Sequence, residues 1–173
     1  MIPKIIHLCW LSGDAFPQAI VDCLNTWNKL LHGYEIWLWG KTPTDTSCLQ
    51  DISITEKHFD LNSTLWTKQA FEAKKYAFAA DYIRLYALYN HGGIYLDADV
   101  IIYKSFDDLL VLPYFIGCDQ IKALEAAVIG AKQGCTWIKD ILDSYSNKQF
   151  IKDDGTYDVM ELPVRFHHEL TAL

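Results

Sequence analysis

The first forty residues alternate between strand and helix patterns. Residues 2–11 form a nearly continuous apolar run, which is typical of a strand buried on both faces of a parallel sheet. Residues 17–31 then repeat apolar side chains at helical spacing, with Pro17 in the first turn and Gly33 just past the end. Residues 34–39 form a second apolar strand. This order predicts a β-α-β unit with parallel strands, and therefore an α/β fold.

The remaining chain is expected to add helices and strands to this unit. Residues 41–66 are polar and weakly periodic, which predicts a loop with short helical pieces. Residues 67–91 form the longest helical pattern, either as one mostly buried helix or as two helices broken near Lys74 and Lys75. Further predictions are an extended segment over 94–103, a strand over 114–118, a compact apolar segment over 123–130, a helix over 136–145 and a loop-rich tail over 150–173, with a turn at 153–155.

Size and composition narrow the function classes. The 173 residues fit one domain, and a hydrophobic fraction of 51% indicates a globular chain. The net charge of −7, without a basic run, argues against a nucleic-acid partner. The five cysteines are scattered without a CxxC pair, which indicates reduced thiols. We find no signal-peptide pattern and no apolar run of the ~18 residues that a membrane span needs. We therefore expect a cytoplasmic protein, a location that also allows peripheral contact with the inner face of a membrane.

Two carboxylates follow an apolar strand in the middle of the chain. Gly92 and Gly93 end a helical pattern, residues 94–96 are apolar, and Asp97 and Asp99 come next. Alternate side chains of an extended segment share one face, so these carboxylates would lie roughly 7 Å apart. Ligands of α/β sheets bind at this end of the strands. Mn²⁺ and Mg²⁺ accept carboxylate oxygens and take further ligands from substrate phosphates, so the pattern predicts a metal-dependent enzyme with a phosphate-bearing substrate.

Asp81 and Arg84 form a second pair of charged residues, within the longest helical pattern. Their spacing of three residues puts them on one helix face. A surface salt bridge, contributing about 0.3–0.5 kcal/mol, is one interpretation. The neighbouring residues are apolar on nearly every side, however, and a mostly buried helix that presents one Asp and one Arg favours a functional interpretation.

These residues carry a family resemblance. Residues 79–100, which include Asp81, Arg84, Asp97 and Asp99, closely resemble the sugar-binding DXD region of glycosyltransferase family 32. Residues 2–13 look like that family's first strand, and residues 124–155 are similar to its downstream region. The resemblance implies a GT-A fold, with a mixed, mainly parallel sheet flanked by helices. It also implies a single domain over 1–173 that lacks the family's usual C-terminal segment.

The resemblance further implies an activity and a set of site residues. The activity is metal-dependent, retaining transfer of a sugar from a nucleotide-sugar, with UDP-sugars favoured and GDP-sugars as an alternative. The acceptor is a saccharide or a lipid-linked molecule, as in capsular or other surface polysaccharide synthesis. By position in the motifs, Arg84, Asp97 and Asp99 would be catalytic. The implied donor-binding residues are Trp10 at the nucleobase, Asp81 and Arg84 at the sugar and phosphates, Tyr95 in the pocket wall, and Asp97 at the ribose, the sugar or a metal-bound water. The implied metal ligands for Mn²⁺ or Mg²⁺ are Asp99 and, beside it, Asp97.

Two alternatives stay open. A haloacid dehalogenase-like phosphatase also ends an apolar strand with Asp-x-Asp, in which case Asp97 would be the nucleophile and Asp99 the acid/base. A non-catalytic remnant would retain nucleotide-sugar binding only. We expect His167 and His168 to be exposed tail histidines rather than metal ligands.

Overall fold

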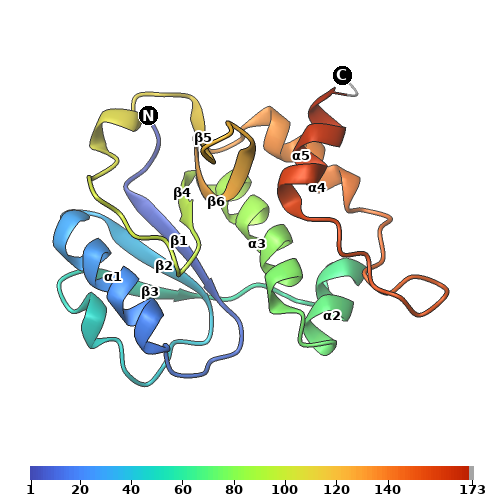
Figure 1. Cartoon of the computed structure of the whole chain (residues 1–173), viewed down its shortest axis with the longest axis horizontal. Coiled ribbons are helices and arrows are strands. Elements are labelled where there is room, and N and C mark those ends of the chain that lie inside the picture. The colour runs from blue at the N-terminus through green and yellow to red at the C-terminus, as the bar shows by residue number, and fades with distance from the viewer. Residues whose placement is uncertain (172–173) are drawn as a thin grey trace.

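The computed structural model describes residues 1–171, with side chains through residue 167, and in this part six strands form one sheet (Figure 1). The strands are β1 (Ile5–Trp10), β2 (Glu35–Gly40), β3 (Ser53–Lys57), β4 (Gly93–Leu96), β5 (Tyr114–Cys118) and β6 (Leu124–Ala131). Their order across the sheet is β3-β2-β1-β4-β6-β5. The first four strands in this order are parallel, whereas β6 is antiparallel to both β4 and β5. The predicted α/β class with a mixed, mainly parallel sheet is confirmed.

Helices cover both faces of this sheet (Figure 1). They are α1 (Gln18–Leu30), α2 (Leu65–Glu72), α3 (Tyr76–His91), α4 (Thr136–Ser144) and α5 (Leu162–Thr171), with short 3₁₀ helices at Ser47–Leu49 and Asp107–Leu109. On one face, α1 packs its buried Leu24 and Trp27 against Ile6 and Leu8 of β1. On the other face, α3 packs with α4 and α5. No helix in the described part of the chain is long and apolar enough to span a bilayer.

Most predicted elements are confirmed, including the strands of the β-α-β unit, the helix between them and the break in the long helical pattern. This break separates α2 from α3, where Lys74 has a φ of 56°. Two predictions are wrong because polar sequence hides regular structure. The expected loop contains β3, an edge strand with exposed positions, and the expected loop-rich tail contains α5.

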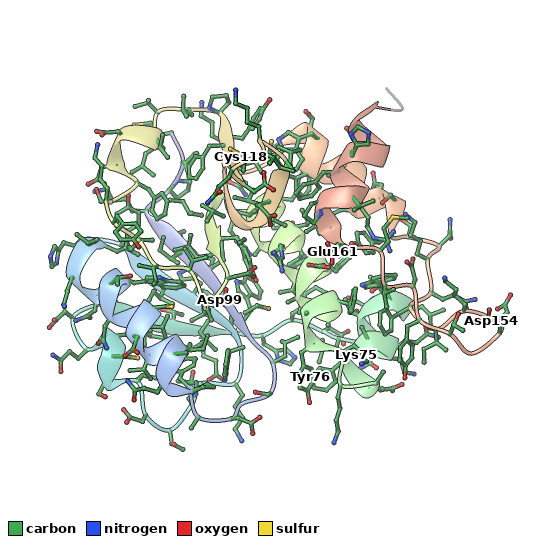
Figure 2. All side chains as sticks on the ribbon, viewed as in Figure 1. Lys75, Tyr76, Asp99, Cys118, Asp154 and Glu161 are labelled. Atoms are coloured by element: carbon green, nitrogen blue, oxygen red, sulfur yellow. The ribbon has the colours of Figure 1, made fainter. Side chains whose placement is uncertain are left out.

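The predicted extension of the central strand beyond residue 99 is also wrong. Residues 100–103 do not pair with the sheet, because side chains of α1 bind their backbone instead. The indole N–H of Trp27 donates to the Val100 carbonyl at 2.8 Å, and the Ile102 N–H donates to the Thr26 hydroxyl at 3.1 Å. The chain already turns at Ala98 and Asp99, where the Val100 N–H donates to the Asp97 carbonyl at 3.1 Å. Asp97 and Asp99 therefore follow β4 in a turn and not in the extended segment that was predicted, and Asp99 lies beyond the end of β4 in Figure 2.

The two glycines between α3 and β4 allow the chain to reverse in a crowded place. Gly92 and Gly93 have φ values of 64° and 113°, which glycine adopts without strain. A Cβ at Gly92 would lie 2.7 Å from the Gln133 nitrogen, and one at Gly93 would lie 2.7 Å from the Ile5 carbonyl oxygen. Gly92 and Gly93 therefore determine where β4 begins, and with it the position of Asp97, four residues after Gly93.

His7 of β1 fastens this reversal to the neighbouring strands. It is fully buried, with Nε2 2.7 Å from the Gly92 carbonyl oxygen and Nδ1 3.1 Å from Nε1 of Trp39. An indole N–H only donates, so Nδ1 accepts and the Nε2–H donates to Gly92. Burial lowers the pKa of His7 to about 4, and the ring is neutral at neutral pH.

Replacing His7 with leucine is expected to lower the free energy of unfolding by about 2–4 kcal/mol, because two buried polar groups lose their partners. Urea denaturation measures this, with exposed His32→Leu as the matched control. In the unsubstituted chain, His7 becomes protonated near pH 6.5 in the unfolded state and only near pH 4 in the folded state. Stability therefore falls as the pH is lowered through that range, and the variant should lack this component. Equal stability of the two variants would contradict the assignment.

Candidate functional site

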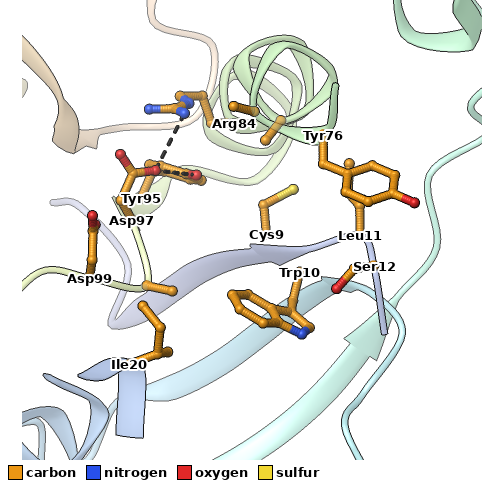
Figure 3. A pocket seen from close by; sticks show the side chains of 13 residues that line it. Cys9, Trp10, Leu11, Ser12, Ile20, Tyr76, Arg84, Tyr95, Asp97 and Asp99 are labelled. Atoms are coloured by element: carbon orange, nitrogen blue, oxygen red, sulfur yellow. Dashed lines mark hydrogen bonds and ion pairs between the residues drawn. The ribbon is translucent and has the colours of Figure 1, made fainter. Parts of the chain in front are cut away.

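A pocket of about 420 Å³ opens at the carboxyl ends of β1 and β4, the edge at which the sequence places the acidic pair (Figure 3). Residues from β1, α1, α3 and the end of β4 form its wall. We call it the donor pocket, after the donor-binding residues that the sequence predicts there. It is lined by Cys9, Trp10, Leu11, Ser12, Ile20, Tyr76, Ala77, Ala80, Arg84, Tyr95, Asp97, Ala98 and Asp99.

The two carboxylates of the acidic pair have different surroundings. Asp97 is fixed, because its Oδ1 accepts the Tyr95 hydroxyl at 2.7 Å and lies 3.3 Å from a guanidinium nitrogen of Arg84. Asp99 is exposed, and within residues 1–167 no side chain or N–H bonds to its carboxylate. One carboxylate is thus held by the protein, while the other is available to a ligand.

The two carboxylates suit a hard divalent cation that takes its remaining ligands from a substrate. Among the residues that the structure describes, no group of three or more His, Cys, Asp or Glu side chains converges on a metal position. Asp97 and Asp99 therefore offer an open site rather than a closed cage. Mg²⁺ is commonly bound in this way, by one or two carboxylates together with waters and substrate phosphates. The residues present fit Mn²⁺ or Mg²⁺ on these terms.

Arg84 of α3 connects the acidic pair to Asp81. Its side chain is only 6% exposed, and one terminal nitrogen lies 3.0 Å from Asp81 Oδ1 as well as near Asp97. The other terminal nitrogen donates to the Ala126 carbonyl at 2.7 Å, and the guanidinium stacks on the Tyr95 ring at 4.4 Å. The ion pair that the helical spacing predicts does form, but it is buried rather than on the surface.

Burial and charge set the protonation of this cluster. Burial raises the pKa of Asp81 to about 6; Arg84 opposes this shift and Asp97 adds to it. Burial raises the pKa of Tyr95 well above its usual value, so its hydroxyl stays a hydrogen-bond donor to Asp97. Burial also raises the pKa of Cys9 to about 12, which keeps this thiol protonated and unreactive.

Two aromatic rings border the donor pocket. Trp10 ends β1; its indole N–H donates to the Asp14 carbonyl at 2.8 Å, and its ring packs edge-on against Phe16. Tyr76 begins α3, and the sequence analysis did not single it out because its only signal is its place after the helix break. Figure 3 shows both rings at the pocket, with Asp97 and Asp99 on its other side.

The structure brings most of the predicted site residues together. Trp10, Arg84, Tyr95, Asp97 and Asp99 all line the donor pocket. Asp81 lines an adjoining pocket that shares Arg84 and Asp97 with it. His167 is exposed on α5 and lines a different pocket, away from the acidic pair. The His168 side chain lies outside the described residues.

Solved glycosyltransferases share the fold of this chain. The chain resembles the PaToxG glycosyltransferase with a TM-score of 0.72 at 22% identity, covering 99% of this chain and 68% of that one. It resembles the galactosyltransferase LgtC with a TM-score of 0.53 at 13% identity, covering 96% and 70%. The expected GT-A fold is therefore confirmed.

Curated relatives include two yeast enzymes. Inositol phosphoceramide mannosyltransferase 3 of Schizosaccharomyces pombe is 28% identical over 141 residues, which are 82% of this chain and 36% of that protein. Mannosyl phosphorylinositol ceramide synthase CSH1 of Saccharomyces cerevisiae is 30% identical over 117 residues, 67% of this chain and 28% of that protein. The chain thus spans about a third of the length of these relatives.

A family model matches the part of the chain that builds most of the site. Residues 17–116 match the glycosyltransferase sugar-binding region containing the DXD motif. The match includes Asp81, Arg84 and Tyr95, and Asp97 and Asp99 form the one Asp-x-Asp sequence within the matched residues. The chain therefore belongs to the family of glycosyltransferases that share this DXD-containing sugar-binding region.

Proposed function

We propose that this chain binds a nucleotide-sugar together with Mn²⁺ or Mg²⁺ and transfers the sugar, with retention of configuration, to a hydroxyl acceptor. The observation that carries the proposal is the composition of the donor pocket. An aromatic ring, a buried arginine and a free carboxylate converge on one cavity at the carboxyl end of the sheet. These groups match a base, a diphosphate and a cation, the three parts of such a donor.

Asp99, with Asp97 beside it, would hold the cation, which would neutralise the charge on the departing diphosphate. The chain's own residues bind and orient the donor. Trp10 and Tyr76 offer ring faces to the base, a contact worth about 1–3 kcal/mol per stacked base. Tyr95 holds Asp97 in place and stays neutral.

Arg84 is buried, but within the described residues not all of its N–H groups are bonded to the protein. A guanidinium has five N–H groups. Three of them face Asp81, Asp97 and the Ala126 carbonyl. The Nε–H is buried and has no hydrogen-bond partner in the described part of the chain. Arg84 therefore orders the acidic residues around it and still has N–H groups to offer to a sugar hydroxyl or a phosphate.

The proposal extends to the substrates and the setting. We favour a UDP-hexose donor. A GDP-hexose is the alternative, and for this alternative we note that the two yeast relatives are named for mannosyl transfer. The acceptor is a saccharide or a lipid-linked molecule, and the relatives' names include an inositol phosphoceramide. We place this reaction in surface polysaccharide synthesis, in the cytoplasm or at the inner face of the membrane.

Thermal unfolding with UDP, GDP, UDP-glucose and GDP-mannose, each with and without Mn²⁺, tests the proposal. A ligand at one hundred times its Kd should stabilise the fold by about 2.7 kcal/mol. We expect one base to stabilise the chain, only when metal is present, and the matching nucleotide-sugar to be hydrolysed slowly to the diphosphate. Stabilisation without turnover would leave the binding remnant, and no stabilisation by any of them would overturn the proposal.

A further inference from the structure

Two further pockets continue from the donor pocket toward α5. The first, which we call the acidic pocket, has a volume of about 280 Å³ and shares Ala77, Arg84 and Asp97 with the donor pocket. The second, the apolar pocket, has a volume of about 410 Å³ and shares Pro163 with the acidic pocket. The two adjoining pockets lie between the β5–β6 hairpin and the start of α5, where Figure 2 shows Glu161.

Carboxylates dominate the acidic pocket. Asp81, Asp97, Glu125 and Glu161 line it, with Arg84 as the one cation among its lining residues. Asp81 and Glu161 interact electrostatically although they lie eighty residues apart in sequence. Carboxylates accept hydrogen bonds from hydroxyl groups, whereas a second anion so close would be repelled. This pocket therefore suits a neutral, hydroxyl-rich group.

Four of the six residues that line the apolar pocket are apolar, and Lys122 and His167 complete its wall. Leu124 of the hairpin is 38% exposed and Val164 of α5 is 44% exposed, with Pro163 between the two pockets. Next to them at the hairpin tip, Ile121 is 84% exposed. The tip is fixed, because Asp119 Oδ1 accepts the N–H groups of Ile121 at 2.9 Å and Ala123 at 2.8 Å. Within residues 1–167, whose side chains the structure describes, Leu124, Val164 and Ile121 remain partly exposed.

Continuity with the donor pocket indicates what covers them. An acceptor must bring its hydroxyl to the donor sugar, and the acidic pocket shares two site residues, Arg84 and Asp97, with the donor pocket. Any part of the acceptor that extends beyond the acidic pocket meets Leu124, Pro163 and Val164 next.

We infer that the acceptor is amphipathic, with a neutral hydroxyl-bearing head in the acidic pocket and an alkyl chain against Leu124, Pro163 and Val164. This inference rests on the proposed function. The residues that it assigns to the alkyl chain, Leu124, Pro163 and Val164, lie outside the matched family region of 17–116.

Steady-state kinetics with different acceptors test this inference, with the nucleotide-sugar that the thermal-unfolding experiment identifies as the donor. Octyl and methyl hexosides carry the same head, and burying two methylene groups already favours binding about tenfold. We therefore expect KM for the octyl hexoside to be at least about tenfold lower. Val164→Asp should bring the two KM values together, and the milder Val164→Ala should narrow the gap if the charged variant folds poorly. Val111→Asp, at an exposed residue remote from the pockets, is the control that keeps the preference.

The possible results separate the inference from the function it rests on. Donor hydrolysis without an octyl preference in the native chain would overturn the inference and leave the proposed function in place. Absence of donor hydrolysis would overturn both. Octyl glucuronide should be a poorer acceptor than octyl glucoside, because its carboxylate enters an acidic pocket. Equal use of the two would overturn the assignment of the head group.

Discussion

Replacing Arg84 with methionine is expected to lower the free energy of unfolding by about 3–5 kcal/mol at pH 8, the usual cost of removing one partner of a buried ion pair. The guanidinium is the counter-charge that Asp81 contacts, and it also binds the Ala126 carbonyl. Methionine fills much of the same space, so the loss reports charge more than packing. Chemical denaturation with Lys139→Met as control measures it, since Lys139 makes an exposed ion pair on α4 whose removal should change little.

The pH dependence shows whether charge is the cause. In the native chain the pKa of Asp81 is about 6, above its ordinary value of 3.8. Between these values the folded chain holds a proton that the unfolded chain has lost, so this group's contribution to stability falls as the pH rises from about 4 to about 6. Without Arg84 the pKa of Asp81 rises further, and protonation then relieves the buried charge. The deficit of Arg84→Met should therefore be smaller at pH 5 than at pH 8.

A double variant provides an independent check. Asp81→Asn in the Arg84→Met background removes the uncompensated carboxylate, so it should restore part of the lost stability at pH 8. The same Asn substitution at Asp143, the partner of Lys139, should have little effect in the Lys139→Met background. A deficit of equal size at pH 5 and pH 8, with no recovery in the double variant, would show that packing rather than charge holds this cluster.

The sequence predicted the elements whose burial leaves a clear period. The strand before Ser12 and the helix after Pro17 are apolar at the expected spacing, and both form. β3 was missed because an edge strand needs only backbone pairing, and Ser53–Lys57 carries polar side chains. The extended continuation after Asp99 was wrong because the backbone of that segment binds side chains of α1, a contact across more than seventy residues.

The site was predictable where chemistry is local. Asp81 and Arg84 share one helix turn, so their spacing alone brings them together. Asp97 and Asp99 do line one pocket as expected, but they do so from a turn and not from an extended segment. Contacts between distant segments were not predictable. No pattern in the sequence shows that Arg84 reaches the Ala126 carbonyl, or that Glu161 shares a pocket with Asp81.

Replacing Asp99 with asparagine is expected to remove metal-dependent donor binding and to leave the fold intact. Asp99 is exposed and its carboxylate has no protein partner in the described residues. The free energy of unfolding should therefore change by no more than about 0.5 kcal/mol. A carboxylate in contact with a divalent cation attracts it by several kcal/mol at a partly exposed site, so the Mn²⁺-dependent affinity for the nucleotide-sugar should fall by at least about 100-fold. Titration calorimetry measures this, with Asp140→Asn, an exposed aspartate of α4, as the charge-matched control.

Asp97→Asn completes the comparison because Asp97 has two tasks. Its carboxylate accepts a hydrogen bond from the Tyr95 hydroxyl and faces Arg84, so this variant should lose both donor affinity and stability, whereas Asp99→Asn loses affinity alone.

A phosphatase would instead form an aspartyl-phosphate on Asp97, which a phosphate mimic would trap. The hydrogen bond and the ion pair at Asp97 Oδ1 favour a positioning task over that of a nucleophile. Retention of Mn²⁺-dependent affinity in Asp99→Asn would remove the metal site from the acidic pair, and with it the basis of the proposed reaction.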